Sequence, residues 1–292
     1  MIQDFRKAVA GIEKSVFGIG DHTGPQFRIF GTGFVIREDG WLMTNRHVLE
    51  PLLLKDGDGN ISISPASRAL QFVVTIRDQS GARQIGWANS RIVELVWMSQ
   101  PNIATPMDVR DDIEIDGQKA DLVLAPEPPD IGICKIDLSL LPPECLPLKP
   151  VRFKRSLDLL IGTPVGCLGY PQGIQGPVST KSIMDLQCCP ILQTGCISAI
   201  LPHPDFPNPT QFLLDIFVNG GSSGSPLMNS DGEILGVVFA ARQQFTQLQE
   251  MLPDGKLKPD KTKGVWSGTA IGCAIPSSAF IDSLSRVLPG AP

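Results

Sequence analysis

Short hydrophobic runs separated by turn residues make up most of this chain, and few segments have the spacing of a helix. The stretch "GTGFVIREDGWLMTNRHVL" (31–49) places two such runs around Asp39 and Gly40, which is a strong signal for a β-hairpin. Further runs typical of strands are "LQFVVTIRD", "IGICKID", "PVGCLGY", "GCISAIL", "FLLDIFV", "EILGVVFA" and "AIGCAIP". Together with the Gly and Pro residues between them, they predict an all-β barrel or sandwich architecture.

Helical spacing is confined to the two ends of the chain. At the start, hydrophobic residues predict an amphipathic helix over residues ~3–13 that covers a barrel edge: Ile2, Phe5, Val9 and Ile12. At the other end, "SSAFIDSLSRVL" predicts a terminal helix, with a serine after Pro276 as its N-cap.

Three stretches rich in polar residues, Pro and Gly interrupt the predicted strands. They are "SQPNIATPMDVRDDIEIDGQKAD" (99–121), "LPHPDFPNPTQ" (201–211) and "ARQQFTQLQEMLPDGKLKPDKTKG" (241–264). Composition of this kind is typical of surface loops, so all three are predicted to be excursions from the barrel.

Composition excludes several classes of partner. The net charge is −5 and no long run of Lys or Arg occurs, so neither nucleic acid nor an anionic membrane surface is an expected ligand. The longest apolar stretches, such as "ILGVVFAA", are far shorter than a membrane span. The 7 cysteines are an odd number without CxxC spacing, which favours a reducing, cytoplasmic location and no metal site. No organic cofactor is implied either.

The candidate chemistry lies in "VNGGSSGSPLMNSDG" (218–232), where serines stand between glycines. A serine nucleophile needs a base, and the chain contains 3 histidines, His22, His47 and His203. His22 and His203 lie in turn-like sequence and are interpreted as surface residues. His47 follows the predicted strand "WLMT" by three residues, where a rigid element can hold an imidazole at a cleft.

The order of the residues excludes one nucleophile pattern. Gly220, Ser222 and Gly224 satisfy the G-x-S-x-G pattern of α/β-hydrolases, in which the histidine follows the serine. No histidine follows position 203 in this chain, so Ser222 is not the predicted nucleophile. A cysteine nucleophile would need a cysteine in the glycine-rich loop, and that loop contains none.

The segment "GTGFVIREDGWLMTNRHVL" resembles the hairpin and histidine motif of trypsin-like serine peptidases, especially those of the bacterial HtrA type. "DIGICKID" is similar to the strand that carries the aspartate of this family, and "DIFVNGGSSGSPLMNSDGEILGVV" is similar to its nucleophile loop and the hairpin beyond it. "IGTPVGCLGYPQG" and "GCAIPSSAFIDSL" resemble the start of the second barrel and the final strand and helix.

The resemblance implies an all-β chain of two six-stranded antiparallel β-barrels of the chymotrypsin type, with a short N-terminal helix and a C-terminal helix. We expect residues 1–150 to form the first domain, which carries the histidine and the aspartate. Residues 151–292 are expected to form the second domain, which carries the serine.

The resemblance further implies a catalytic triad of His47, Asp130 and Ser223, in the chain order that this fold uses. In the pattern G-x-S-G-[GS]-P, Gly221 and Ser223 take the places whose N–H groups form the oxyanion hole. Asp121, in "KADLVLAP", also precedes an apolar run and remains the alternative acid; Asp130 is preferred because "DIGICKID" matches the family's strand.

Two positions depart from the pattern of the digestive trypsins. Ser222 stands where those enzymes have the aspartate that binds a newly cut N-terminus, so activation by trimming is not expected. Phe217 stands where those enzymes have the carboxylate that binds basic side chains of the substrate. This implies a shallow apolar specificity pocket, completed by Val238, Phe239 and Ala240. Asp215 nearby would instead favour basic side chains if it pointed into that pocket.

These features predict a serine endopeptidase that cleaves protein or peptide substrates through an acyl-enzyme. The alternative is a catalytically idle trypsin-fold protein that binds or scaffolds partners. The chain ends soon after the predicted second barrel, so we expect no PDZ domain. We therefore expect gating by loop ordering, with 201–211 and ~241–264 as candidate elements, or by a regulatory protein partner.

Overall fold

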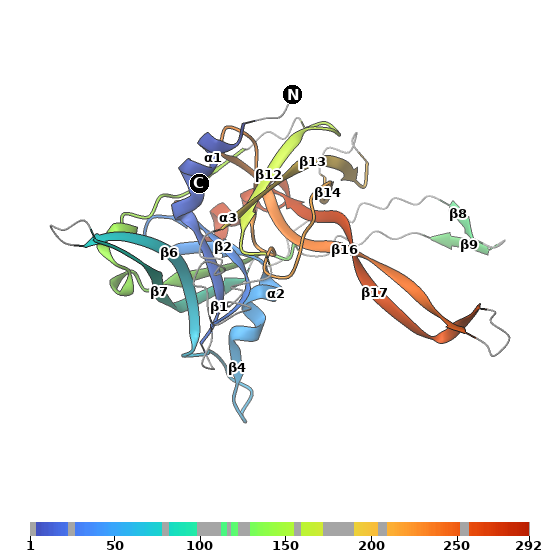
Figure 1. Ribbon diagram of the computed structural model, residues 1–292, viewed down its shortest axis with the longest axis horizontal. Coiled ribbons are helices and arrows are strands. Elements are labelled where there is room, and N and C mark those ends of the chain that lie inside the picture. Colours follow the sequence, from blue (N-terminus) through green and yellow to red (C-terminus); the bar gives the residue numbers. More distant parts are fainter. Residues whose placement is uncertain are drawn as a thin grey trace.

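The computed structural model describes most of the chain as strands and turns. The described residues are 4–22, 27–77, 82–97, 112–115, 118–121, 129–154, 159–171, 190–203, 209–251 and 257–291. Within them the strands build two barrels that lie against each other, and a long ribbon of two strands projects from the second barrel (Figure 1).

The first barrel is a closed sheet in the order β1-β2-β3-β10-β7-β6. All of its neighbouring strands are antiparallel. Its strands are β1 (Val16–Asp21), β2 (Arg28–Arg37), β3 (Trp41–Thr44), β6 (Ser67–Arg77), β7 (Ala82–Trp97) and β10 (Gly132–Ile136).

The second barrel has the order β16-β15-β12-β13-β14-β17, and pairing of β16 with β17 closes the ring. A short strand, β11 (Arg152–Phe153), pairs in parallel with the start of β16. The six strands are β12 (Pro164–Gly169), β13 (Ile191–Leu201), β14 (Gln211–Leu214), β15 (Pro226–Met228), β16 (Glu233–Met251) and β17 (Leu257–Pro276).

The remaining elements decorate the barrels. Two separate hairpins are formed by β4 (Leu53–Lys55) with β5 (Ile61–Ile63) and by β8 (Asp112–Ile115) with β9 (Gln118–Asp121). The α-helices are α1 (Arg6–Ile12), α2 (Arg46–Leu49) and α3 (Ile281–Val287), and the 3₁₀ turns are η1 (Glu13–Ser15), η2 (Glu50–Leu52), η3 (Leu138–Leu140), η4 (Pro143–Cys145) and η6 (Ser277–Ala279).

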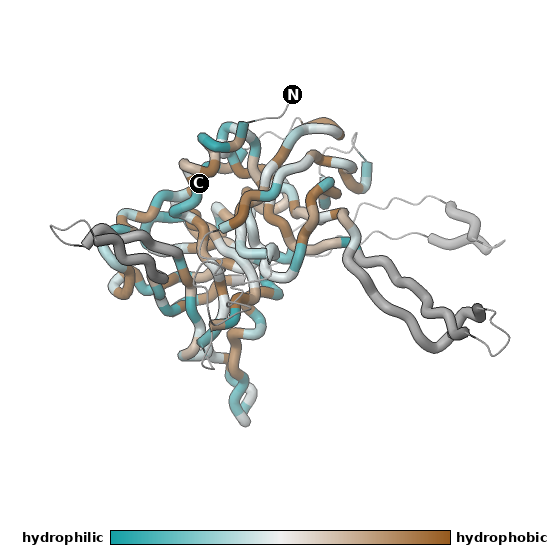
Figure 2. The backbone as a smooth tube through the Cα atoms, viewed as in Figure 1, coloured by the Kyte–Doolittle hydropathy of each residue, from teal (hydrophilic) through white to brown (hydrophobic). Residues whose placement is uncertain are grey.

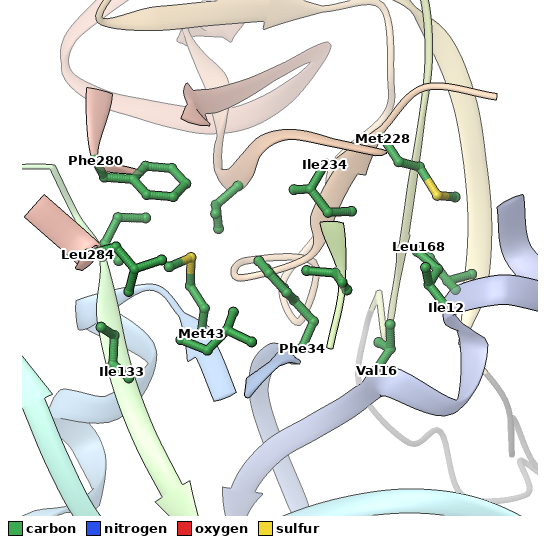
Figure 3. Packing of buried hydrophobic residues seen from close by; sticks show 14 of the residues in the cluster. Ile12, Val16, Phe34, Met43, Ile133, Leu168, Met228, Ile234, Phe280 and Leu284 are labelled. Carbon is green, nitrogen blue, oxygen red and sulfur yellow. The ribbon is translucent and has the colours of Figure 1, made fainter. Parts of the chain in front are cut away.

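A cluster of buried hydrophobic residues joins the barrels. Phe34 and Met43 of the first barrel belong to the same cluster as Leu168 and Ile234 of the second, and Leu284 of α3 is also part of it (Figure 3). Burial of each side chain of this size contributes roughly 1.5–3 kcal/mol, so this cluster is a large part of what fixes one barrel against the other. Figure 2 shows the hydrophobic stretches along the barrel strands and hydrophilic ones along α1.

The predicted class is confirmed: the chain is mostly strand, with two barrels, a short N-terminal helix and a C-terminal helix. The C-terminal helix starts later than predicted, because Ser277 opens a 3₁₀ turn and Phe280 is the N-cap residue of α3. The division into domains 1–150 and 151–292 stays a prediction. No helix among the described residues is long and apolar enough to cross a membrane.

The interpretation of 241–264 as a loop was wrong. Most of this stretch belongs to β16 and β17, which pair from Gln243 with Gly268 to Met251 with Leu257. In the stretch 99–121, residues Asp112–Ile115 pair with Gln118–Asp121 as a hairpin, and the rest lies outside the described residues. Residues 204–208 of the stretch 201–211 also lie outside them.

Candidate active site

His47 lies on α2, a single helical turn that follows β3. Val48 and Leu49 are buried in the core of the first barrel, which anchors this turn by one face. The imidazole is on the other face, with 45% of its side-chain surface exposed. The ring is therefore held by a fixed backbone and remains open to solvent and to a substrate.

Asp130 lies two residues before the start of β10, which pairs with β3 and brings Gly132 opposite Thr44. This register places the carboxylate beside the histidine: Asp130 Oδ2 lies 2.5 Å from His47 Nδ1, and Oδ1 accepts from the His47 backbone N–H at 3.1 Å. The buried amide of Asn45 donates to the Asp130 carbonyl oxygen at 2.7 Å. Asp121 belongs to β9, which forms a separate two-stranded sheet with β8 within the described part of the chain.

The loop that carries Ser223 consists of two consecutive tight turns. The N–H of Ser222 donates to the Asn219 carbonyl and the N–H of Ser225 donates to the Ser222 carbonyl, both at 3.0 Å. The third residue of each turn is a glycine with positive φ, 90° at Gly221 and 85° at Gly224. Type II turns require this conformation, which other residues rarely adopt, so the glycine spacing sets the path of the loop.

Thr32 of β2 links this loop to the first barrel. Its N–H donates to the Ser223 carbonyl at 2.7 Å, and its Oγ1 donates to the Gly221 carbonyl at 2.8 Å. The same hydroxyl accepts from the N–H of Tyr170 at 3.0 Å, and the Thr32 carbonyl accepts from Thr44 Oγ1 at 2.6 Å. Thr32 is fully buried, so each of these bonds is shielded from water.

Sequence reasoning did not single out Thr32, although it lies inside the quoted motif "GTGF". The neighbouring Gly31 shows how closely the loop of Ser223 and the helix of His47 approach β2. A Cβ at Gly31 would lie 2.4 Å from Val48 Cγ2 and 2.7 Å from the Ser223 carbonyl oxygen. The loop of Ser223 and the helix of His47 therefore both pack against the backbone of β2.

The hydroxyl of Ser223 donates to the carbonyl of Phe239 in β16, at 3.1 Å. Among the described residues this is its one hydrogen bond, and His47 bonds through its ring to Asp130 alone. No described residue accepts a hydrogen bond from the backbone N–H of Gly221 or of Ser223. Both N–H groups are thus free to bind an anionic oxygen atom.

The predicted specificity residues have different surroundings. Phe217 is 51% exposed, and its carbonyl accepts a hydrogen bond from the side chain of Gln193. Val238 is 0% exposed within the core of the second barrel. Phe239 packs against the cluster between the barrels, and Ala240 is half-buried. Asp215 is exposed, without a side-chain partner among the described residues.

The other histidines and the buried cysteines are not part of this site. His22 and His203 are exposed. Burial raises the pKa of the Cys134 and Cys167 thiols to about 12, which suppresses the reactive thiolate at neutral pH. The residues that the structure describes contain no group of His, Cys, Asp and Glu side chains that could hold a metal ion.

Comparison with known proteins assigns the chain to a family. Residues 31–237 match the trypsin-like peptidase domain family, and this range covers His47, Asp130 and Ser223. The chain belongs to the trypsin-like peptidase family. Strand order places these residues in two barrels, as the resemblance implied.

Two curated relatives of this trypsin-like peptidase are serine proteases. A probable periplasmic serine endoprotease, DegP-like, of Halomonas elongata is 27% identical over 214 residues, which cover 72% of this chain and 29% of the relative. Serine protease HTRA1A of Danio rerio is 33% identical over 111 residues, 38% of this chain and 20% of the relative. The chain therefore spans less than a third of either relative.

Two solved structures show a more distant similarity. The serine endoprotease of Yersinia pestis has a TM-score of 0.48 at 16% identity, covering 99% of this chain and 68% of the other. An HtrA-type protease solved with a tripeptide has a TM-score of 0.47 at 17% identity, covering 99% and 65%.

Proposed function

We propose that this trypsin-like peptidase is a serine endopeptidase that cleaves protein or peptide substrates. Ser223 is the nucleophile, His47 is the base, and Asp130 is the carboxylate that orients His47. The observation that carries the proposal is the contact between His47 Nδ1 and Asp130 Oδ2, which leaves the other ring nitrogen of a half-exposed imidazole available. A carboxylate on one ring nitrogen stabilises the imidazolium that forms when the other accepts a proton.

In this mechanism the Ser223 oxygen attacks the carbonyl carbon of the scissile peptide bond while His47 Nε2 takes the hydroxyl proton. The negative oxygen of the tetrahedral intermediate accepts hydrogen bonds from the N–H groups of Gly221 and Ser223. The bond to nitrogen then breaks, His47 returns its proton to the leaving amine, and an ester on Ser223 remains. Water, deprotonated by His47, hydrolyses this ester and restores the serine.

The bond from Ser223 to Phe239 defines a resting position of the nucleophile. A neutral hydrogen bond contributes about 0.5–1.5 kcal/mol net, and about 1.36 kcal/mol corresponds to a tenfold change in rate. Release of this one bond therefore slows catalysis by about tenfold at most. A resting nucleophile of this kind suits an enzyme that is gated by substrate or by a partner, and it gives no support to the idle alternative.

For the specificity pocket we propose an apolar entrance at Phe217 and Ala240, with Val238 behind it in the barrel core. A small or medium aliphatic side chain of the substrate would fit such an entrance. Cleavage of a peptide library mainly after Arg or Lys would contradict this proposal. It would indicate instead that Asp215 points into the pocket and binds basic side chains.

The cellular location stays a prediction. All described cysteines are free, as expected in a reducing compartment such as the cytoplasm. The Halomonas elongata relative, in contrast, carries the name of a periplasmic protease. Fractionation of cells followed by detection with an antibody against this chain would distinguish the two locations.

The proposed activity is tested by incubating the purified protein with β-casein and following the fragments by mass spectrometry. We expect cleavage by the parent and by Ser198→Ala, an exposed serine of the second barrel that serves as the matched control. Ser223→Ala should lose the activity, whereas cleavage that survives in this variant would refute the assignment of the nucleophile.

A further inference from the structure

Asn45 is the N-cap residue of α2, the helical turn that carries His47. Its backbone is extended, with φ −86° and ψ 153°, and its carbonyl accepts from the Val48 N–H at 3.3 Å. Asparagine is a preferred N-cap residue because its side-chain oxygen accepts a hydrogen bond from the N–H of the second or third helical residue. In α2 these residues are His47 and Val48.

The side chain of Asn45 does not cap the helix in this way. It makes no hydrogen bond to the first turn of α2. The His47 N–H, which an N-cap side chain ordinarily binds, donates instead to Asp130 Oδ1 at 3.1 Å. The carboxylate of the proposed triad therefore caps the helix of the proposed base.

The side chain of Asn45 is turned toward the segment that carries this carboxylate. Its Nδ2 donates to the Asp130 carbonyl oxygen at 2.7 Å. Its Oδ1 is buried and has no hydrogen-bond partner among the described residues. A buried polar atom without a partner lowers stability, and a bond to the helix would satisfy this oxygen. The observed orientation thus gives up helix capping in favour of the bond to Asp130.

The sheet does not fix the backbone of Asp130. The ladder between β3 and β10 ends at the pair of Thr44 and Gly132, two residues after Asp130. Before that pair, the Ile131 N–H donates to the Pro129 carbonyl at 2.7 Å, so Asp130 is the central residue of a three-residue turn. Among the described residues, the Asp130 carbonyl accepts from Asn45 alone.

The segment that leads from Asp130 into β10 lies directly against α2. A Cβ at Gly132 would lie 3.2 Å from the Asn45 carbonyl oxygen and 2.8 Å from Leu49 Cδ1. A shift of either segment would therefore change the distance between Asp130 and His47.

We propose that Asn45 is a positioning residue that holds the carboxylate of Asp130 against His47. The Asn45 side chain binds the Asp130 backbone, and the Asp130 side chain takes over the capping bond to the His47 N–H and reaches the imidazole. This inference rests on the proposed function. A displacement of about 1 Å in a catalytic group can cost ~10²-fold in rate, so the bond from Nδ2 matters to the reaction although Asn45 does not take part in it.

Asn45→Thr removes this bond with little change in side-chain volume. Threonine is also a favoured N-cap residue, but its hydroxyl is one bond closer to the backbone than the Asn45 Nδ2 and does not reach the Asp130 carbonyl. We expect kcat for peptide cleavage to fall roughly 10- to 100-fold, with KM within about twofold of the parent value. Asn89→Thr, at an exposed position of β7, is the matched control and should keep both constants. Folded Asn45→Thr with the kcat of the parent would overturn the inference.

The proton between His47 Nδ1 and Asp130 Oδ2 reports the geometry without turnover. In a hydrogen bond of 2.5 Å this proton resonates far downfield in an NMR spectrum, and its loss in His47→Ala assigns it. In Asn45→Thr the signal should move upfield and exchange faster with water, whereas Asn89→Thr should leave it unchanged. The same signal in Asn45→Thr as in the parent would overturn the inference.

The same spectrum separates this inference from the proposed function. In a Ser223→Ala background, Asn45→Thr should still shift the signal. If the parent cleaves no peptide and the shift is observed, the proposed function alone fails.

The parent protein provides the test if Asn45→Thr does not fold. A scalar coupling across the hydrogen bond should join Nδ2 of Asn45 to the carbonyl carbon of Asp130. Absence of this coupling would overturn the inference and leave the peptidase proposal intact.

Discussion

The two halves of the candidate site are in different states of assembly. In the first barrel, the ring of His47 already contacts Asp130 at 2.5 Å, and both groups are positioned by β3, α2 and the start of β10. In the second barrel, the Ser223 hydroxyl bonds to Phe239 of its own barrel. The described residues thus contain the contact within the first barrel, whereas the proposed hydrogen bond between His47 and Ser223, which would join the two barrels, is not formed among them.

If the proposed mechanism holds, the difference indicates where the reaction would be controlled. What connects the two halves at the site is Thr32, whose bonds reach the carbonyls of Gly221 and Ser223. Movement of one barrel relative to the other, or of the loop relative to β2, would change the distance between base and nucleophile without disturbing either half. A substrate or partner that stabilises one such arrangement would therefore act as a switch.

The largest effect is expected from a substitution in the first barrel, where His47 already contacts Asp130. His47→Ala removes the base, and kcat for peptide cleavage should fall by ~10⁴–10⁶, because the triad groups act as a unit. The matched control is His22→Ala, which changes an exposed histidine outside the site and should retain the parent's kcat. Equal activity of the two variants would exclude His47 as the base.

Asp130→Asn breaks the same half more gently. The neutral amide keeps the size of the side chain but cannot stabilise the imidazolium, so we expect a loss of ~10⁴ in kcat with little change in KM. Asp121→Asn is the control for the alternative acid and should behave as the parent. Steady-state kinetics on one peptide substrate would compare them; the opposite ranking would assign the acid to Asp121.

Thr32→Val tests the link between the two halves of the site, because it removes a hydrogen bond between β2 and the loop of Ser223 and leaves His47, Asp130 and Ser223 unchanged. The variant is nearly isosteric and removes the hydroxyl that binds the Gly221 carbonyl at 2.8 Å. We expect kcat/KM to fall ~10²-fold through displacement of the oxyanion loop, and the free energy of unfolding to fall by about 1–3 kcal/mol.

Thr32→Ser keeps the hydroxyl and is the control for this change. It should restore most of the activity and should retain the reactivity of the parent toward a fluorophosphonate. Thr32→Val that is unstable but fully active would show that Thr32 stabilises the fold without positioning the loop.

The smallest effect concerns the cysteines. Because burial raises the pKa of Cys134 and Cys167 to about 12, almost none of either thiol is ionised at pH 8. Iodoacetamide at pH 8 should therefore leave both unmodified in the folded protein and leave kcat unchanged, while protein unfolded in urea should react at both. Rapid labelling of the folded protein, detected by peptide mapping, would contradict this account.

The parts of the site that the sequence predicts are those encoded locally. His47 and the loop of Ser223 each lie in one short motif, in which turn glycines and a strand end dictate the local backbone. The resemblance also placed Asp130, which the register of β3 with β10 brings to the histidine. Thr32 acts through bonds to residues that are 189 and 138 positions away, and no local pattern encodes such contacts.

The fold shows the same division between local and distant determinants. Strands that bury one face in a barrel have a recognisable pattern of hydrophobic residues, and this pattern predicts the all-β fold class correctly. The ribbon of β16 and β17 has no further strand against it among the described residues, so alternation is not imposed on residues 243–268. Polar composition then resembles that of a loop, although "PDG" between two runs containing Phe245 and Trp266 is a turn signal that could have indicated a hairpin.

The central claim is that the two halves form one triad with Ser223 as nucleophile. The most direct test is reaction of the parent, Ser223→Ala and His47→Ala with a fluorophosphonate, followed by mass mapping of the labelled peptide. We predict one phosphonylated residue, Ser223, in the parent, with no label in Ser223→Ala and a far slower reaction in His47→Ala. Label on Ser222 or Ser225, or an equal rate in His47→Ala, would contradict the claim.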